Sequence, residues 1–459
     1  MLHRIIVLLM LLYFVFSANL LFAQNESERI SETPPVFNEL DKNSDGRLSR
    51  DELSNPALFE RMDANANGWV TIAEAQRWAQ RRAKRESSVE VSQNTDSNYD
   101  AVVYPPDPET ESARRSLLEK IDDVTTGEKR PPNIVLILAD DLGYADTGVY
   151  GSTPIPTPHI DALAAEGTHF TNAYVTAASC SPSRAGLISG RYQQRFGFEF
   201  NTSSGAITHR CYRGLDPAAI TLAEVLHKAG YATGMFGKWH LGTHPHLHPQ
   251  SRGFDEFYGF LAGAHSFFPV PNEEPVYSTI MRGREAINEP KYLTDAIARE
   301  TVRFIDEHHD RPFFAYVPFN AVHTPIQATP EYQERFSSVS DPKRRDYYAM
   351  TSALDDAVGK IVDAIDRQGL TNDTLIVFLN DNGGPIYTGV QSNGPLRLGK
   401  LFLFEGGVRV PMIMRWPGVV PPTTVFDGTV SSLDVFPTVS AAANIDLQEV
   451  VDFDGIDLL

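Results

Sequence analysis

The chain has 459 residues, a formal net charge of −19 and only two cysteines, Cys180 and Cys211. So acidic a chain disfavours nucleic acid as a partner, because the phosphate backbone would be repelled. With two cysteines in so long a chain, a large hydrophobic core rather than disulfides must stabilise the fold. The composition therefore indicates a globular protein that does not bind nucleic acid.

The first 23 residues have the pattern of an export signal. Met1 to Arg4 carry positive charge, residues 5–16 are apolar without interruption, and Ala23 ends a short segment suited to cleavage. The apolar run is too short for a comfortable membrane span, and no later segment reaches about 18 consecutive apolar residues. We predict cleavage near Ala23, export to a periplasmic or extracellular location and no stable membrane span. An uncleaved anchor is the alternative.

Residues 24–86 contain two copies of a calcium-loop pattern. Each copy has oxygen-bearing side chains at positions 1, 3, 5, 9 and 12, a glycine at the sharp turn and an apolar residue at position 8. The predicted calcium ligands are Asp41, Asn43, Asp45, Arg47 and Glu52 in the first loop and Asp63, Asn65, Asn67, Trp69 and Glu74 in the second. Arg47 and Trp69 stand at position 7, which binds calcium through the backbone carbonyl. We predict an EF-hand pair that holds up to two calcium ions weakly, for rigidity or for docking to a partner. A solvated acidic spacer is the alternative.

The remaining sequence divides into a linker and a large domain. Residues 87–130 are rich in Ser, Asp, Glu and Pro and lack apolar periodicity, which predicts a disordered linker. From Pro131 onward, β-prone apolar runs alternate with amphipathic helical stretches. This alternation is typical of an α/β domain in which helices cover both faces of a mostly parallel sheet. Residues 131–459 are predicted to form one such domain.

Acidic residues follow two of the predicted strands. The strand Asn133–Ala139 ends in Asp140 and Asp141, and the strand over 374–379 ends in Asn380-Asp381-Asn382. In open α/β sheets ligands collect beyond the carboxyl ends of the strands. Three carboxylates and an amide oxygen form an oxygen-only site that suits calcium or magnesium and not zinc.

Cys180 begins the pentapeptide Cys-Ser-Pro-Ser-Arg, in which a helix is predicted to begin at Pro182. From the residues alone, it could form a disulfide with Cys211, remain a buried thiol or act as a thiolate nucleophile. The pentapeptide, followed by AGLISGR over 185–191, also resembles the signature of type I sulfatases. In that family the cysteine is oxidised after translation to formylglycine, an aldehyde that becomes hydrated.

Six motifs resemble this family, in the same order, across residues 133–411. Besides the pentapeptide and the two acidic clusters they are GKWHLG at 237–242, NAVHTP at 320–325, and NGPLRLGK at 393–400 with EGGVRVP at 405–411. The resemblance implies an alkaline-phosphatase-like sandwich preceded by the small helical EF-hand module. It also implies one calcium ion held against residue 180 by Asp140, Asp141, Asp381 and Asn382. Leu398 and Leu401 replace glycines that usually flank the family lysine, so Arg397 is an alternative to Lys400.

The resemblance further implies catalytic roles for Cys180, Arg184, Lys238, His240, His323 and Lys400. The cationic side chains would neutralise the sulfate, His323 or Lys400 would protonate the leaving alcohol, and His240 would take a proton from the formylglycine hydrate. A maturation enzyme that generates formylglycine would be required. Because the family pattern normally continues into a smaller subdomain after the region ending at Leu459, the catalytic domain is expected to be C-terminally incomplete.

The implied function is hydrolysis of sulfate monoesters, similar to that of arylsulfatases and N-acetylgalactosamine sulfatases. Export, few cysteines and a calcium module favour a bacterial enzyme that acts on sulfated polysaccharide or glycosaminoglycan-type sugars. Two alternatives stay open. One is a phosphomonoester or phosphonate ester hydrolase of the same superfamily, and the other is a calcium-dependent binding protein with an inactive sulfatase domain.

Overall fold

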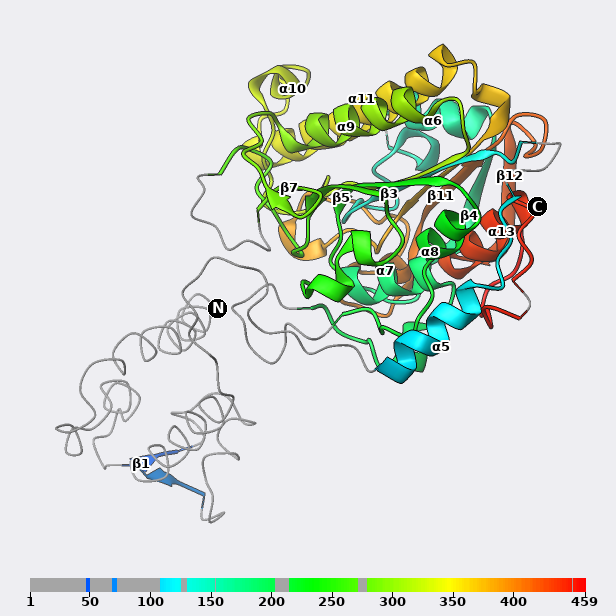
Figure 1. The fold of residues 1–459 in the computed structure, drawn as a ribbon. Helices are drawn as coiled ribbons and strands as arrows, with labels where there is room; N and C mark the ends of the chain where they lie inside the picture. Colours follow the sequence, from blue (N-terminus) through cyan, green and yellow to red (C-terminus); the bar gives the residue numbers. More distant parts are fainter. Residues whose placement is uncertain are drawn as a thin grey trace. The chain divides into compact units, whose positions relative to one another are not determined.

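The computed structural model describes residues 47–49, 68–71, 108–124, 130–152, 154–202, 214–270, 279–447 and 449–459. The chain divides into two compact units, residues 1–97 and 98–459 (Figure 1). Within the described ranges, no helix is long and apolar enough to cross a membrane. The predicted signal segment, residues 1–23, lies outside these ranges.

In the first unit, two short strands join the predicted calcium loops. Strand β1 (Arg47–Leu48) pairs antiparallel with β2 (Val70–Thr71), so Leu48 lies opposite Val70, and both side chains are buried. These two residues are the apolar position 8 of each loop. The predicted ligands Arg47 and Trp69 are described, whereas Asp41, Asn43, Asp45, Glu52, Asp63, Asn65, Asn67 and Glu74 lie outside the described residues.

The second unit is built on a ten-stranded sheet of order β12-β4-β11-β10-β3-β9-β5-β6-β7-β8. Its strands are β3 (Asn133–Ala139), β4 (Thr168–Tyr174), β5 (Ala232–Lys238), β6 (Glu256–Phe260), β7 (Met281–Arg282), β8 (Glu285–Ala286), β9 (Phe313–Pro318), β10 (Thr374–Asn380), β11 (Arg409–Arg415) and β12 (Thr424–Ser431). Strands β10, β3, β9, β5 and β6 run parallel, while β11 and β7 are antiparallel to their neighbours. The predicted mostly parallel α/β sheet is therefore confirmed at its centre.

Helices cover both faces of this sheet, as Figure 1 shows. On one face lie α6 (Pro158–Ala165), α9 (Leu293–His308), α10 (Pro330–Glu334) and α11 (Pro342–Arg367), and on the other α5 (Pro108–Leu118), α7 (Cys180–Ser189), α8 (Leu222–Lys228) and α13 (Val435–Ala442). Val135 and Ile137 of β3 enter the first core cluster, and Ile134 and Leu136 the second. Because alternate residues of a strand point to opposite faces, the uninterrupted apolar run of β3 fits a strand buried on both sides.

Shorter elements complete the unit. They are α12 (Glu405–Val408) and the 3-10 helices η2 (Gly148–Tyr150), η3 (Gln193–Phe196), η4 (Pro245–Leu247), η5 (Pro249–Ser251), η7 (Thr371–Asp373), η8 (Ile386–Thr388) and η9 (Ser432–Asp434).

The N-terminal part of the second unit differs from the prediction of a linker over the whole of 87–130. Residues 108–118 form α5, whose Arg114 donates a hydrogen bond to Glu224 of α8 at 2.6 Å. Ile121 is buried in the second core cluster, and Leu117 and Leu118 pack against it. The sequence lacks a full apolar periodicity here because only these few side chains contact the core. A linker can therefore extend only to the start of α5.

Candidate active site

The register of β3 and β10 brings the two acidic clusters together. The strands are parallel neighbours, paired from Asn133 with Thr374 through Ala139 with Asn380. Asp140 and Asp141 therefore leave the sheet beside Asp381 and Asn382, although about 240 residues separate them in sequence. The two acidic clusters therefore lie side by side at the carboxyl ends of β3 and β10, as the sequence predicted.

The four side chains are buried and linked to one another. Asn382 Nδ2 donates to Asp141 Oδ1 at 2.8 Å, and the amide of Asp141 donates to Asp381 Oδ1 at 3.5 Å. Asp141 has a backbone φ of 61°, a left-handed conformation that is uncommon for a residue with a side chain. Asn382 Oδ1 is buried without a hydrogen-bond partner. An unpaired acceptor among three carboxylates is a natural position for a cation.

Cys180 lies against this acidic group as the first residue of α7. The helix begins two residues earlier than predicted, with Ser179 as its N-cap. Cys180 is a free cysteine and only 1% exposed, and its Sγ lies 3.7 Å from Asp140 Oδ1. Cys211 lies outside the described residues. The helix N-terminus favours negative charge developing at residue 180.

Two buried cationic side chains contact the carboxylates of the site. Arg184, one turn along α7 from Cys180, donates through Nε to Asp381 Oδ2 at 2.9 Å and through Nη1 to the carbonyl of Lys238 at 2.8 Å. Lys238, the last residue of β5, donates through Nζ to Asp140 Oδ2 at 2.6 Å. Both side chains are fully buried. Helix α7 thus supplies positive charge to both Asp381 and Asp140, and strand β5 supplies it to Asp140.

Lys400 supplies a third cation from a loop. Its Nζ lies 2.9 Å from Asp141 Oδ2 and 3.2 Å from Cys180 Sγ. The guanidinium of Arg397 instead lies over the ring of Phe404, 4.3 Å from its centroid, and the residue is exposed. Of the two candidates from the sequence, the structure brings Lys400 to Cys180.

The two predicted histidines occupy different positions. His323, in the loop after β9, lies with Nε2 3.5 Å from Asp141 Oδ2, and its Nδ1 is 2.5 Å from the carbonyl oxygen of Thr324. Ligand atoms of Asp140, Asp141, Cys180 and His323 all lie within 4.8 Å of one another. The ring of His240 is buried, with Nε2 3.2 Å from the carbonyl oxygen of Thr202 and Nδ1 without a partner. Its carbonyl accepts a 2.7 Å hydrogen bond from Ser181 Oγ, which ties His240 to the first turn of α7.

Comparison with known proteins agrees with this geometry. The family model "Sulfatase" matches residues 132–445. The chain belongs to the sulfatase family. An EF-hand model matches residues 35–55, which include the first predicted calcium loop.

Two curated sulfatases and one crystal structure are similar to most of this chain. N-acetylgalactosamine-6-sulfatase of Rattus norvegicus is 34% identical over 357 residues, which cover 73% of this chain and 66% of the rat protein. Arylsulfatase A of Homo sapiens is 36% identical over 353 residues, which cover 72% and 67%. The crystal structure of Ps i-CgsB in complex with k-i-k-neocarrahexaose has 40% identity and a TM-score of 0.68, and covers 72% of this chain and 75% of that one. The chain thus spans about two thirds of the length of these two curated relatives.

Burial and neighbouring charges shift the pKa values of the groups in the candidate site. Burial raises the pKa of Asp140, but Lys238, His323 and Arg184 outweigh it and hold this pKa well below its usual range. Burial and the charge of Asp140 raise the pKa of Asp381 to about 6. The opposite shifts show that Asp140 ionises in preference to Asp381, because burial and the charge of Asp140 both oppose a second negative charge at Asp381. An oxygen-rich, electron-rich site of this kind fits a divalent cation.

The same factors determine which groups can exchange protons. Burial raises the pKa of the Cys180 thiol to about 12, which argues against a thiolate nucleophile. Burial and Lys238 lower the pKa of His240 well below its usual value, so its ring is neutral and able to accept a proton. Burial also lowers the pKa of His323. Burial lowers the pKa of Lys400, but the neighbouring Cys180 and the carboxylate of Asp141 outweigh it and raise this pKa well above its usual value, so Lys400 stays protonated.

Sequence reasoning missed two residues that hold the site loops. The Asn393 side chain accepts hydrogen bonds from the amides of Tyr144 (3.3 Å) and Gly384 (2.9 Å), and donates to the carbonyls of Gly384 (2.7 Å) and Leu398 (3.0 Å). It thereby links the loops that carry Asp141, Asn382 and Lys400. Asp146 accepts from the amides of Gly143 and Ser392 and from the Tyr347 hydroxyl. In the sequence, Asn393 and Asp146 are simply polar residues in motif loops. That pattern does not distinguish a side chain that links two loops from one that points into solvent.

Proposed function

We propose that the chain hydrolyses sulfate monoesters of a sulfated polysaccharide, with Cys180 converted to formylglycine. The observation that carries this proposal is that Cys180 lies beside both acidic clusters and three cationic side chains. Lys400 lies 3.2 Å from the sulfur, and Asp140, which Lys238 holds, lies 3.7 Å from it. A sulfate ester is an anion whose hydrolysis develops charge on both the attacking and the leaving oxygen. A buried site rich in fixed cations stabilises such charge.

One calcium ion is expected to complete the site. Asp140, Asp141, Asp381 and Asn382 would hold it, since they offer only oxygen donors and the Asn382 Oδ1 acceptor is unpaired. When bound, calcium supplies positive charge next to the sulfate and to the oxygen on residue 180. It would also relieve the crowding of carboxylates that raises the pKa of Asp381.

The side chains of this chain then have separate tasks. The Cys180 sulfur marks the position of the nucleophilic oxygen of a formylglycine hydrate. Arg184 and Lys238 fix Asp381 and Asp140, and together with Lys400 they neutralise the sulfate oxygens. His323 or Lys400 protonates the leaving alcohol, and the neutral His240 ring takes the proton of the second hydroxyl on residue 180.

Two relatives support a choice of substrate class. The crystal structure at 40% identity contains a neocarrahexaose, and the rat relative is an N-acetylgalactosamine-6-sulfatase. Both names concern galactose-type sugars, so we expect a carrageenan-type oligosaccharide to be cleaved faster than sulfated glucosamine derivatives. Sulfate release from panels of both oligosaccharide types would test this order.

The decisive test concerns Cys180 itself. Mass spectrometry of the peptide containing residue 180, from protein produced together with a formylglycine-generating enzyme, should show the aldehyde. Cys180→Ala should release no sulfate, while Cys211→Ala should remain active. An unmodified thiol in active protein, or full activity in Cys180→Ala, would refute the proposal.

The alternatives within and outside the superfamily have their own readouts. A phosphate or phosphonate ester hydrolase would cleave nitrophenyl phosphate or a phosphonate ester faster than nitrophenyl sulfate. A calcium-dependent binding protein with an inactive domain would release no sulfate at all. Any sulfate release that depends on Cys180 excludes the second alternative.

We also propose roles for the two segments at the N-terminus of the chain. Residues 1–23 would direct export to a periplasmic or extracellular location and be removed near Ala23. The EF-hand pair over 24–86 would bind up to two calcium ions for rigidity or docking. Calorimetric titration of the full chain with calcium should show these sites beside the catalytic one. Asp63→Ala should remove one of them without changing sulfate release.

A further inference from the structure

An exposed apolar surface follows directly after Lys400. Leu401 is 62% exposed and Leu403 86%, and Phe402 and Phe404 are also exposed. Ile386 and Tyr387 of η8 are exposed as well, Tyr387 by 62%. We call residues 386–387 and 401–404 the apolar lip. Exposed apolar side chains scattered singly need no explanation, but a run of four in sequence next to a reactive centre does.

The lip borders the site through backbone contacts. The amide of Leu401 donates to the carbonyl of Ala178 at 2.7 Å, two residues before Cys180. The amide of Lys400 donates to the carbonyl of Gly384 at 3.2 Å, which links the residues that precede the two segments of the lip. Tyr387 lies three residues after Gly384, so both segments of the lip follow closely in sequence from residues that border the site.

The backbone of Leu401 makes its side chain informative. Its φ is 72°, in the left-handed region that glycine adopts freely and that costs other residues free energy. A leucine in a core could offset that cost by packing, but this side chain is mostly in solvent. Strained backbone of this kind is retained where the side chain or the loop has a role. The exposed Leu401 side chain is therefore placed to contact a ligand rather than the protein's own core.

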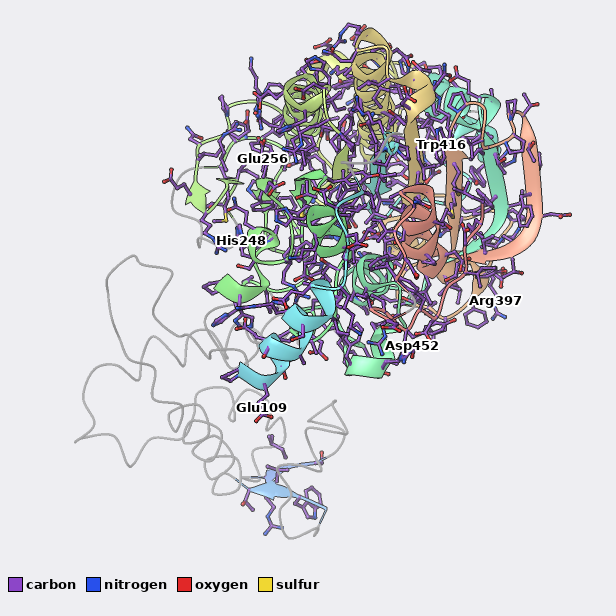
Figure 2. All side chains as sticks on the ribbon, turned by 45° about the vertical axis from the view of Figure 1, so that its right-hand side comes forward. Glu109, His248, Glu256, Arg397, Trp416 and Asp452 are labelled. Carbon is purple, nitrogen blue, oxygen red and sulfur yellow. The ribbon has the colours of Figure 1, made fainter. Side chains whose placement is uncertain are left out.

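Arg397 adds a charge at the edge of the lip. Its guanidinium lies 4.3 Å from the centroid of the Phe404 ring, which holds the cation in place at the surface. Figure 2 shows Arg397 at the periphery of the unit. An apolar surface beside a fixed arginine suits a ligand with C–H faces and anionic groups. A sugar chain with more than one sulfate has both.

We propose that the apolar lip and Arg397 bind the sugar unit next to the one whose sulfate is removed. Leu401 and Tyr387 pack against the C–H face of that unit, and Arg397 pairs with a further sulfate on the chain. The protein then prefers sulfated oligosaccharides to small aryl sulfates. This inference rests on the proposed function and names the part of the substrate that provides specificity.

The test uses binding as well as turnover. Full-length Leu401→Gly and Tyr387→Ala are titrated calorimetrically with a sulfated carrageenan hexasaccharide, in protein that retains the Cys180 thiol and so does not turn it over. Each variant should weaken binding about tenfold, because apolar surface that the bound hexasaccharide would cover is lost. Thr423→Gly is the matched control. It removes the same kind of strain at φ 51° on an exposed loop between β11 and β12, and should change binding less than about twofold.

Kinetics and stability separate specificity from damage to the site. Leu401→Gly and Thr423→Gly should both raise Tm, because glycine relieves the backbone strain. In formylglycine-containing protein, Leu401→Gly should raise KM for the hexasaccharide and leave kcat/KM for nitrophenyl sulfate unchanged. Arg397→Met should weaken binding of the hexasaccharide at low salt and lose most of that effect at high salt.

Two results would overturn the inference: hexasaccharide binding to Leu401→Gly as tight as to the parent protein, or equal losses on the hexasaccharide and on nitrophenyl sulfate. Absence of sulfate release from every ester would instead count against the proposed function. The binding titration would still report on the lip in that case.

Discussion

Two charge clusters in the second unit are built in opposite ways. Around α9, Glu300 accepts hydrogen bonds from Arg282, Arg299 and Arg303, and Glu289 accepts from Arg299 and Tyr258. These arginines are 34 to 47% exposed. In the candidate site, the carboxylates and cations are almost entirely buried.

The difference between the clusters lies in what is left unpaired. Burial raises the pKa of Glu300, but Arg282 and Arg299 outweigh it and lower this pKa to about 2, so the carboxylate is fully satisfied. In the site, Asn382 Oδ1 and His240 Nδ1 are buried without hydrogen-bond partners. Burying unpaired polar groups is costly, so their presence marks the places where an ion or a substrate belongs. The α9 cluster is complete in itself, whereas the site is not.

The largest effect is expected for Arg184→Met. Removing this buried cation leaves Asp381 without its charged partner and should destabilise the protein by about 3 to 5 kcal/mol. Sulfate release should also be lost. Urea unfolding measures the stability change. Because the cost arises from the uncompensated carboxylate, Arg184→Met combined with Asp381→Asn should be less destabilised than Arg184→Met alone. A cost below about 1 kcal/mol would make the site behave like an exposed ion pair.

A pH-dependent effect is expected from Asp146, which links the loop over 143–146 to Ser392. Burial raises its pKa to about 6, and hydrogen bonds from Tyr347, Ser392 and Gly143 only partly oppose this. Since the folded-state pKa lies above the unfolded value, ionisation destabilises the fold. The contribution of Asp146 to stability therefore falls as pH rises from about 4 to about 6, by up to about 3 kcal/mol. Unfolding of Asp146→Asn across this range should lack that decrease, and an unchanged pH dependence would contradict the assignment.

Asn393→Ala should affect both stability and turnover. It leaves the amides of Tyr144 and Gly384 and the carbonyl of Leu398 without their partner, which should cost about 2 kcal/mol. Because the Lys400 loop loses an anchor, kcat should fall more than KM rises. Asn372→Ala, an exposed amide on η7, is the control and should change neither. Equal behaviour of the two variants would show that Asn393 does not position the loop.

The smallest effect is expected in the α9 cluster. Arg282→Ala removes one of three arginines around Glu300, and the remaining two still donate to that carboxylate. The free energy of unfolding should change by less than about 1 kcal/mol, and the kinetics should not change. A large loss of stability would mean that this exposed cluster, too, depends on every member.

The sequence was sufficient where the pattern is local. The apolar run over Asn133–Ala139 coincides with β3, and both acidic clusters follow strands whose parallel pairing places them together. It could not choose between Arg397 and Lys400, because a separation of three residues in a loop leaves either within reach of the site. The links made by Asn393 and Asp146 also escaped it, since they depend on loops that meet only after the sheet has formed. The packing of α5 was missed because its few apolar side chains do not repeat.

The pairing of β3 with β10 also has a kinetic consequence. The two halves of the acidic group are joined only when strands about 240 residues apart in sequence have aligned in register. Closing so long a loop is entropically unfavourable, and topologies dominated by such contacts fold slowly. Asp140 and Asp141 follow β3, whereas Asp381 and Asn382 follow β10, so the four ligands come together only after these two strands have paired. Cation binding at the four ligands would therefore appear late in folding. The appearance of that binding would then report that the central sheet is complete.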